Sequence, residues 1–329
     1  MDIKNRQALK QAASDALSSA PNEKKLITCY TGVTIGLGIL FTIADTLLGK
    51  AASGGGGLSD LGRSTLLQTF QSLLPVVQLV FTILWTKGYL RSMMYIGRGQ
   101  NADLQTVTQT FRLFGPIFRL EMLVGLIFGG ILFGCTYLGT YLYMFSPFGL
   151  PLVEQLNASG SMLSGEMMIT DAATAAIREH MLPMLGITMA LCAIVALPLF
   201  YSYRMASYCL LDDPRAGARA SLRWSKAMMR NRRMELFKLD LSLWWYYALE
   251  AGALVISYIP MILSLLGIRL PMSDTVSGYL FLGIYYVLIF LIHVKLRNYC
   301  EVIYVKAYDR LRTPDEPPQP VILGNIFQM

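Results

Sequence analysis

Charged residues are scarce in this chain of 329 residues. Asp, Glu, Lys and Arg make up 15% of it, against 54% hydrophobic residues. Soluble domains carry about 25% charged residues, so the composition argues against a water-soluble fold, and the mean hydropathy of +0.47 favours a membrane protein. The five cysteines show no C-x-x-C spacing, which predicts neither a disulfide framework nor a zinc site. We expect them to pack as small apolar residues.

Catalytic signatures are missing as well. The chain contains no H-E-x-x-H, G-x-S-x-G or P-loop sequence, and no G-x-G-x-x-G between a strand and a helix. Their absence counts against an ATPase, a zinc protease and a dehydrogenase. The only histidines are His180, in an expected loop, and His293, near the end of a span, and this placement predicts neither a metal site nor a triad. We therefore expect a non-enzymatic protein without catalytic residues, cofactor or metal.

What is present instead is a set of long apolar runs. Each is close to the ~20 residues that a helix needs to cross ~30 Å of hydrocarbon, so they predict an all-α, polytopic membrane helix bundle. The predicted spans cover residues 26–48, 66–85, 117–145, 182–203, 239–262 and 276–294. Polar residues before the first run are too many for a signal peptide, so this run is expected to remain as an anchor.

The two ends of the chain differ from the spans. Residues 1–25 are predicted to form an amphipathic cytoplasmic helix that lies on the membrane surface. Residues 313–329 include the stretch TPDEPPQP and are predicted to form a flexible cytoplasmic tail.

The basic residues predict an orientation. Of the 28 Lys and Arg residues, 24 fall in residues 1–25, 87–119, 204–238 and 295–312. Because such residues are retained on the cytoplasmic side, both termini are predicted to be cytoplasmic. The net charge of +7 is concentrated beside apolar runs. Its predicted partners are therefore the bilayer and its anionic lipid headgroups, not nucleic acid.

A short pattern recurs where spans end. Gly88–Tyr95 reads GYLRSMMY, Tyr201–Tyr208 reads YSYRMASY, and Lys295–Tyr299 reads KLRNY. The recurrence predicts three pseudo-repeated helix pairs. The alternative is that each helix leaving a membrane ends in aromatic and basic residues. In the third span, glycines at 125, 129, 130 and 134 have the G-x-x-x-G spacing that allows another helix to approach closely.

An intramembrane polar site is predicted around Glu250. Ionisable groups inside hydrocarbon are costly and are functional candidates, and Glu250 lies roughly 18 Å along the helix from Lys238 at ~1.5 Å per residue. Tyr246 and Tyr247 lie one turn earlier, and Gln78 has a similar depth in the second span. Two hypotheses remain open: a structural carboxyl bound to these groups, and a proton-carrying group of a transporter.

A basic cytoplasmic surface is the second candidate site. Its residues are Arg91, Arg204, Arg297, Arg223, Lys226, Arg230, Arg232 and Arg233. The first three occupy one depth on three helices, which favours a basic ring for a lipid phosphate or an anionic partner, although snorkelling explains each separately. Asp240 and Ser242, at the start of the fifth span, are expected to cap that helix, or Asp240 to pair with Arg204.

A resemblance is visible at the junction between the fourth and fifth spans. The chain is similar there to the pattern S-x-x-L-M-x-G/N … L-F-x-L-x-L-S-F-x-x-W of an uncharacterised bacterial integral-membrane family, domain of unknown function 975. The matching residues are Ser225, Met229, Asn231, Leu236, Phe237, Leu239, Asp240, Leu241, Ser242, Trp244 and Trp245, and the departures are Met228 and Leu243. The resemblance implies a multi-pass protein of the bacterial cytoplasmic (inner) membrane and implies no activity.

Two functional hypotheses follow from these features. The first is a scaffold or accessory subunit that binds a membrane or cytoplasmic protein partner, or anionic lipid, through its basic linkers. The second is a transporter of a small molecule or lipid, with a path near Glu250 and helices broken at Pro75, Pro198 and Pro260. The sequence specifies neither a cargo nor an oligomeric state.

Overall fold

The structure is a computed structural model that describes residues 6–53, 58–158, 171–265 and 274–312. Those residues are almost entirely helical and contain no strand. The chain divides into two compact units. Unit 1 comprises residues 1–118 and 205–329, and unit 2 comprises residues 119–204.

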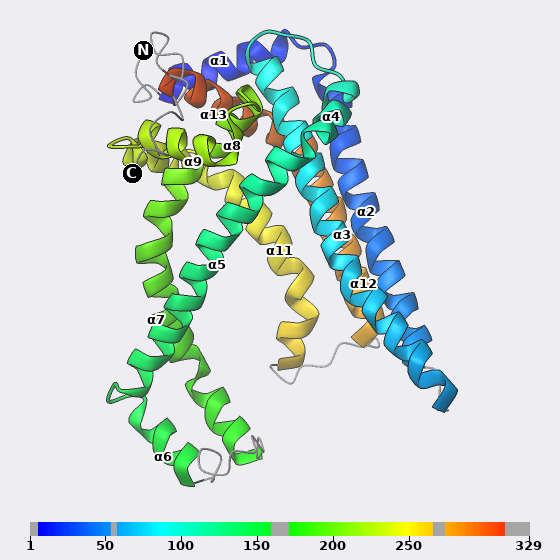
Figure 1. Ribbon diagram of the computed structural model, residues 1–329, viewed down its shortest axis with the longest axis vertical. Coiled ribbons are helices and arrows are strands. Elements are labelled where there is room, and N and C mark those ends of the chain that lie inside the picture. The colour runs from blue at the N-terminus through cyan, green and yellow to red at the C-terminus, as the bar shows by residue number, and fades with distance from the viewer. Residues whose placement is uncertain (1–5, 54–57, 159–170, 266–273, 313–329) are drawn as a thin grey trace, which may run out of the picture. The chain divides into compact units, whose positions relative to one another are not determined.

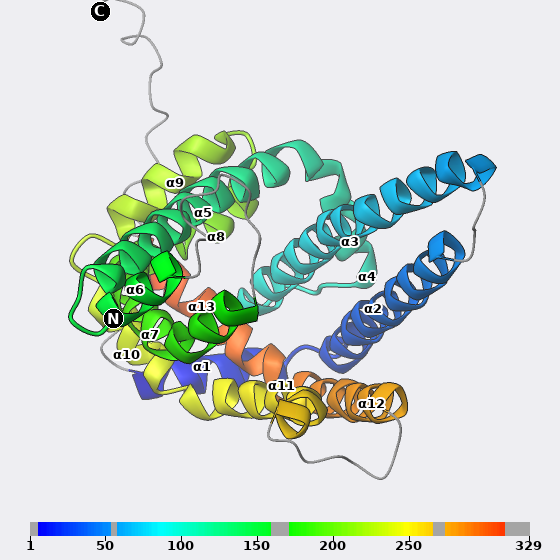
Figure 2. The same cartoon turned by 90° about the horizontal axis from the view of Figure 1, so that it is seen from below.

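Unit 1 holds four of the long helices. These are α2 (Glu23–Ser53), α3 (Leu58–Gly97), α11 (Trp244–Leu265) and α12 (Asp274–Ile292). Helix α2 packs against α3, and α11 packs against α12, as Figure 2 shows in a view from below. The chain leaves α12 through a π-helical turn, η2 (His293–Arg297), that continues directly into α13 (Asn298–Leu311).

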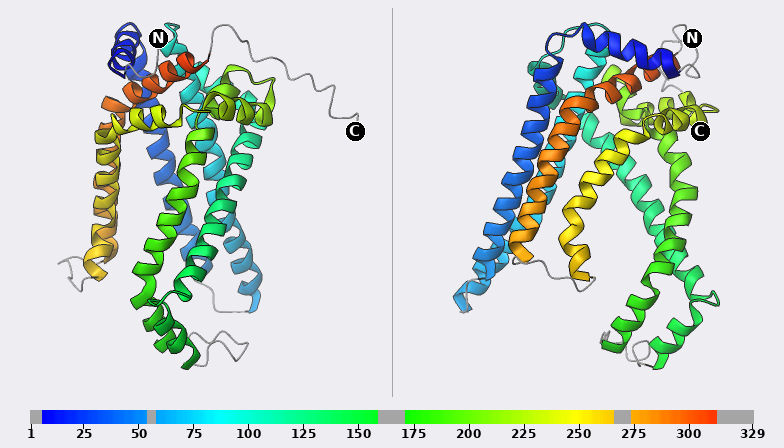
Figure 3. Two further views of the ribbon diagram at one scale, coloured as in Figure 1. Left: turned by 90° about the vertical axis from the view of Figure 1, so that its left-hand side faces the viewer. Right: turned by 180° about the vertical axis from the view of Figure 1, so that it is seen from behind.

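Short helices gather at one end of these four, and we refer to them as the platform (Figures 1 and 3). They are α1 (Arg6–Ser18), α8 (Ala206–Asp212), α9 (Gly217–Met228), α10 (Arg233–Leu241) and α13. Helix α1 packs against α13 with Leu9 and Ala13 buried. The amphipathic N-terminal helix is therefore present, but its apolar side faces protein and not the membrane surface.

Glycine permits two close helix contacts in unit 1. A Cβ atom at Gly88 would lie 2.6 Å from the backbone oxygen of Val107 in α4 (Leu104–Gln109). At Gly97, a Cβ would lie 2.7 Å from a methyl group of Val305. Helices α4 and α13 therefore pack directly against the backbone of α3 at these two glycines, and α3 ends at Gly97.

Unit 2 is built mainly from two long helices. Helix α5 (Phe114–Met144) begins shortly after the turn η1 (Thr110–Leu113), and most of it belongs to this unit. After α6 (Leu150–Ala158), the chain returns through α7 (Asp171–Tyr203). The predicted loop at 146–181 therefore contains α6 and the first turns of α7 where it is described.

Contacts inside unit 2 differ from the glycine prediction. A Cβ at Gly139 would lie 2.5 Å from the hydroxyl of Thr188, so α5 and α7 approach closely there. At the four glycines of the G-x-x-x-G stretch, an added Cβ would have no described atom within 4 Å apart from the neighbouring backbone of α5 itself. His180 lies within α7 and not in a loop, and its Nδ1 is 2.6 Å from the Tyr143 hydroxyl.

Six helices among the described residues are long and apolar enough to cross a membrane. They extend over Glu23–Ala51, Thr65–Gly97, Leu104–Met144, Pro183–Asp212, Trp244–Leu263 and Val276–Leu311. The predicted all-α architecture with six spans is confirmed. The helix breaks predicted at Pro75, Pro198 and Pro260 are not observed. Helices α3, α7 and α11 each continue through their proline.

Candidate functional site

Glu250 lies at the centre of a polar cluster between α11 and the π-helical turn η2. Its Oε1 accepts a hydrogen bond from the Tyr246 hydroxyl, one turn earlier on α11, at 2.5 Å. The same oxygen is 3.0 Å from Nε2 of His293, the first residue of η2. Tyr246 and His293 are buried, whereas the Glu250 side chain is 32% exposed on the surface of the chain. The carboxyl is therefore partly accessible.

Arg297 completes this cluster against the imidazole ring of His293. Its Nη1 is 3.4 Å from His293 Nδ1 and 3.5 Å from Nε2, about equally far from both ring nitrogens. With its hydrogen on Nε2, a neutral imidazole donates to the Glu250 carboxylate and keeps Nδ1 as an acceptor. In this state the three side chains Arg297, His293 and Glu250 together carry one positive and one negative charge.

Two aromatic rings hold the guanidinium of Arg297. Its central carbon lies 4.9 Å from the ring centroid of Tyr30 on α2 and 5.5 Å from that of Tyr89 on α3. The rings stack with centroids 4.1 Å apart, and the Tyr89 hydroxyl donates to the Asn298 side chain at 2.7 Å. A cation in this position is stabilised by the ring faces, so the site draws residues from α2, α3, α11, η2 and α13.

Sequence reasoning missed His293 and Arg297 as partners of Glu250. Both residues were noted in the sequence, but they lie 43 and 47 positions after Glu250. Only the packing of α11 on α12 brings them close to its carboxyl group. A π-helical turn often marks a functional position, and here it provides both residues.

The other predicted members of the intramembrane site lie elsewhere. Gln78 is half-buried on α3, and no hydrogen bond joins it to Glu250 among the described residues. Tyr247 points to Tyr304 of α13, with 2.6 Å between the two hydroxyl oxygens. Tyr304 in turn donates to Asp240 Oδ1 at 2.7 Å.

Asp240 and Ser242 do not lie at the start of the fifth long helix. Asp240 belongs to α10, Ser242 follows it, and α11 begins only at Trp244. The Ser242 hydroxyl donates to the Leu239 carbonyl at 2.7 Å, which differs from the predicted N-terminal cap. Through Tyr304, the Asp240 carboxylate ties the end of α10 to α13.

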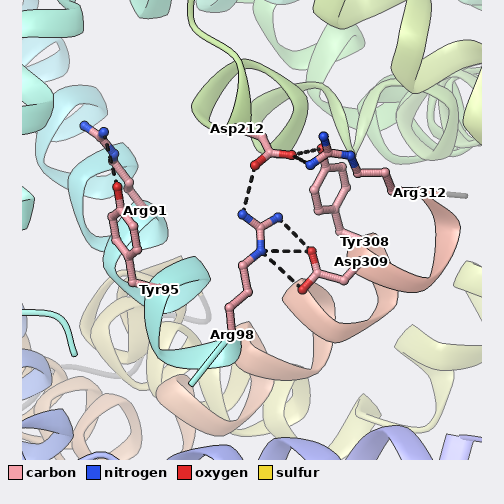
Figure 4. Close-up of polar contacts among 7 residues, drawn as sticks. All are labelled: Arg91, Tyr95, Arg98, Asp212, Tyr308, Asp309 and Arg312. Atoms are coloured by element: carbon pink, nitrogen blue, oxygen red, sulfur yellow. Dashed lines mark hydrogen bonds and ion pairs between the residues drawn. The ribbon is translucent and has the colours of Figure 1, made fainter. Parts of the chain in front are cut away.

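The basic residues of the predicted ring have separate surroundings. Arg91 donates to the hydroxyl of Tyr95 on its own helix at 3.5 Å (Figure 4), and its guanidinium carbon is 5.8 Å from the centroid of that ring. Arg204, in unit 2, lies over Phe200 at 5.2 Å. With Arg297 held by Tyr30 and Tyr89, the ring of three arginines stays a prediction.

A charged cluster joins the end of α3 to the ends of two platform helices, α8 and α13 (Figure 4). Arg98, just after α3, donates to Asp212 of α8 at 2.8 Å and to Asp309 of α13 at 2.7 Å. Asp212 also accepts from Tyr308 and Arg312. Burial alone would lower the pKa of Arg98, but the hydrogen bonds to Asp309 and Asp212 outweigh it and raise the pKa. The guanidinium therefore stays charged and fastens the ends of α3, α8 and α13 together.

The basic segment of α9 and α10 presents most of its charges to the outside. Its exposed basic residues are Arg215, Arg219, Arg223, Lys226, Arg230, Arg232 and Lys238, and Arg233 is half-buried. Residues on the other side of α9 are buried, among them Leu222 and the motif residue Ser225. The turn between the two helices places Asn231 at φ 66°. Glycine and asparagine tolerate this left-handed conformation best, which accounts for the G/N position of the motif.

No group of three or more His, Cys, Asp or Glu side chains in the described part of the chain is placed to hold a metal ion.

The helices and their lengths define a multi-pass membrane protein. The chain belongs to the family described as a protein of unknown function (DUF975), whose model matches residues 1–314. No curated protein and no solved structure matches the chain.

Proposed function

We propose that this is a non-enzymatic scaffold or accessory subunit of the bacterial cytoplasmic membrane. In this proposal both termini and the platform are cytoplasmic, and the basic side of α9 binds an acidic protein partner. The concentration of Lys and Arg in the segments that form the platform supports the orientation.

One observation carries the proposal, the separation of charge and burial on α9. Arg219, Arg223 and Lys226 are exposed at positions i, i+4 and i+7, so they share one side of the helix. Residues Ala218, Ser221, Leu222 and Ser225 are buried on the other side, and α9 packs against α8. The basic side is thus fixed in position and has no acidic residue of α9 beside it. Such a surface steers acidic partners.

The test is affinity purification of the full chain from its membrane, followed by mass spectrometry of the associated proteins. The variant Arg219→Gln/Arg223→Gln/Lys226→Gln removes the basic side of α9. Its control, Arg230→Gln/Arg232→Gln/Lys238→Gln, removes the same charge from the neighbouring segment. We expect a stoichiometric partner that the first variant loses and the control retains. A partner set that is the same for all three proteins contradicts the proposal.

Transport is a second candidate function, and the Glu250 cluster favours it. A partly exposed carboxyl in contact with a buried histidine is a group that proton-coupled transporters use. The test uses proteoliposomes with a trapped pH-sensitive dye. Proton movement that is present in the native protein and absent from Glu250→Gln supports transport, whereas equal leakage in both supports the scaffold alone.

A further inference from the structure

Helix α10 has two apolar sides, of which one is buried and the other is exposed. Leu236 and Leu239 are fully buried. Met234, Phe237 and Leu241 are 62%, 40% and 58% exposed. At about 100° per residue, the three exposed side chains lie within roughly 60° of one another and point away from the two leucines.

The covered side of α10 is firmly attached to the platform. Arg6 and Lys10 of α1 donate to the carbonyl oxygens of Lys238 and Ser242, at 3.3 Å and 3.1 Å. These carbonyls belong to the C-terminal end of α10, where helices lack internal donors and favour cations. Together with the hydrogen bond from Tyr304 to Asp240, they fix which side of α10 faces outward.

Chain continuity puts the outward side at the membrane surface. Helix α10 ends at Leu241, and α11, one of the six spans, begins at Trp244. Trp244 is itself 63% exposed, and tryptophan is enriched at the boundary between headgroups and hydrocarbon. An exposed apolar helix side within one turn of a span lies where acyl chains begin.

Positive charges beside the exposed apolar side of α10 favour anionic lipid headgroups. Lys238 borders the outward apolar side, and Arg230 and Arg232 precede the helix, all three exposed. The acidic residues of α10 are Glu235 and Asp240, and Asp240 is engaged by Tyr304. Long basic side chains beside an inserted apolar surface extend their charges to the phosphate level.

We infer that α10 is an interfacial helix that binds anionic phospholipids. Met234, Phe237 and Leu241 contact the acyl chains, and Arg230, Arg232 and Lys238 bind the phosphodiester headgroups. This site uses a different helix from the protein-binding side of α9 and does not depend on it.

The test is lipid retention by the full chain. The protein is reconstituted in nanodiscs of equal parts phosphatidylglycerol and phosphatidylcholine, transferred to mild detergent, and the bound lipids are counted by mass spectrometry. We expect enrichment of phosphatidylglycerol in the native protein. The variant Arg230→Gln/Arg232→Gln/Lys238→Gln should reduce this enrichment about fivefold or more, since one basic contact contributes about that factor. The equal-charge control Arg219→Gln/Arg223→Gln/Lys226→Gln should retain it within about twofold.

Two results would overturn the inference: no preference for phosphatidylglycerol in the native protein, or equal losses in the two triple variants. A second measurement tests the inference independently if the triple glutamine variant fails to fold. Met234→Trp puts a fluorophore on the outward side, where its added emission should be quenched by brominated lipid, and more by brominated phosphatidylglycerol than by brominated phosphatidylcholine. Added emission that brominated lipid leaves unquenched means that protein or water covers this side, and it would refute the lipid site.

Discussion

Removing the Glu250 carboxyl is predicted to destabilise the protein in a way that depends on the replacement. Glu250→Ala deletes the hydrogen bond from His293, and hydrogen bonds between helices in membranes average ~0.6 kcal/mol with a maximum near 1.7. It also leaves the buried hydroxyl of Tyr246 without its acceptor, which costs about 1–3 kcal/mol. Removing a poorly solvated charge offsets part of this loss. We expect a total of about 1–3 kcal/mol for alanine and less than about 1 kcal/mol for glutamine, whose carbonyl still accepts.

Native cysteines provide the assay. Cys209 and Cys300 are buried in unit 1, so a thiol-reactive fluorogenic dye reports its unfolding in detergent. A double-mutant cycle with His293→Ala isolates the contact between the two side chains. We expect a coupling energy of about 0.6–1.7 kcal/mol. A coupling near zero, or a glutamine variant as unstable as the alanine variant, would refute the hydrogen-bonded arrangement.

Three further substitutions test the packing of unit 1 by the same assay. Gly88→Ala should lower the free energy of unfolding by about 1–3 kcal/mol, because its Cβ would meet the Val107 carbonyl; a neutral effect would contradict the close contact of α3 and α4. Arg98→Gln should cost about 1–3 kcal/mol and cost less at high salt, since it removes charged hydrogen bonds that are partly exposed. Asn298→Leu should cost about 1–3 kcal/mol in the native background and less when combined with Tyr89→Phe, because both lose the amide hydrogen bonds to Glu23 but only the single variant leaves the buried Tyr89 hydroxyl unpaired.

The helices could be predicted from the sequence because each carries its own signal. Apolar runs of sufficient length define the spans, and α3 continues past its predicted span, 66–85, to Gly97. Helix α1 shows the limit of such signals. Its apolar stripe predicts an amphipathic helix, but a stripe does not specify its partner, and the structure buries Leu9 and Ala13 with α1 against α13.

The candidate site was only partly predictable for the same reason. Depth along the helix singled out Glu250, and helical spacing singled out Tyr246, which donates to it. His293 lies 43 positions away, and no local pattern links it to the carboxyl. Arg98 and Asp309, which form an ion pair, are 211 positions apart. Contacts of this kind arise from tertiary packing, and no periodic pattern in the sequence indicates them.

The most direct test of the account is photo-crosslinking from the basic side of α9 in living cells. A photoreactive amino acid at Arg223 is compared with one at Phe148, which is also exposed but lies in the segment expected on the opposite side of the membrane. We predict a discrete crosslinked cytoplasmic protein from position 223 and none from position 148. No adduct at 223, or a partner from outside the cytoplasm, would contradict the proposed orientation and function together.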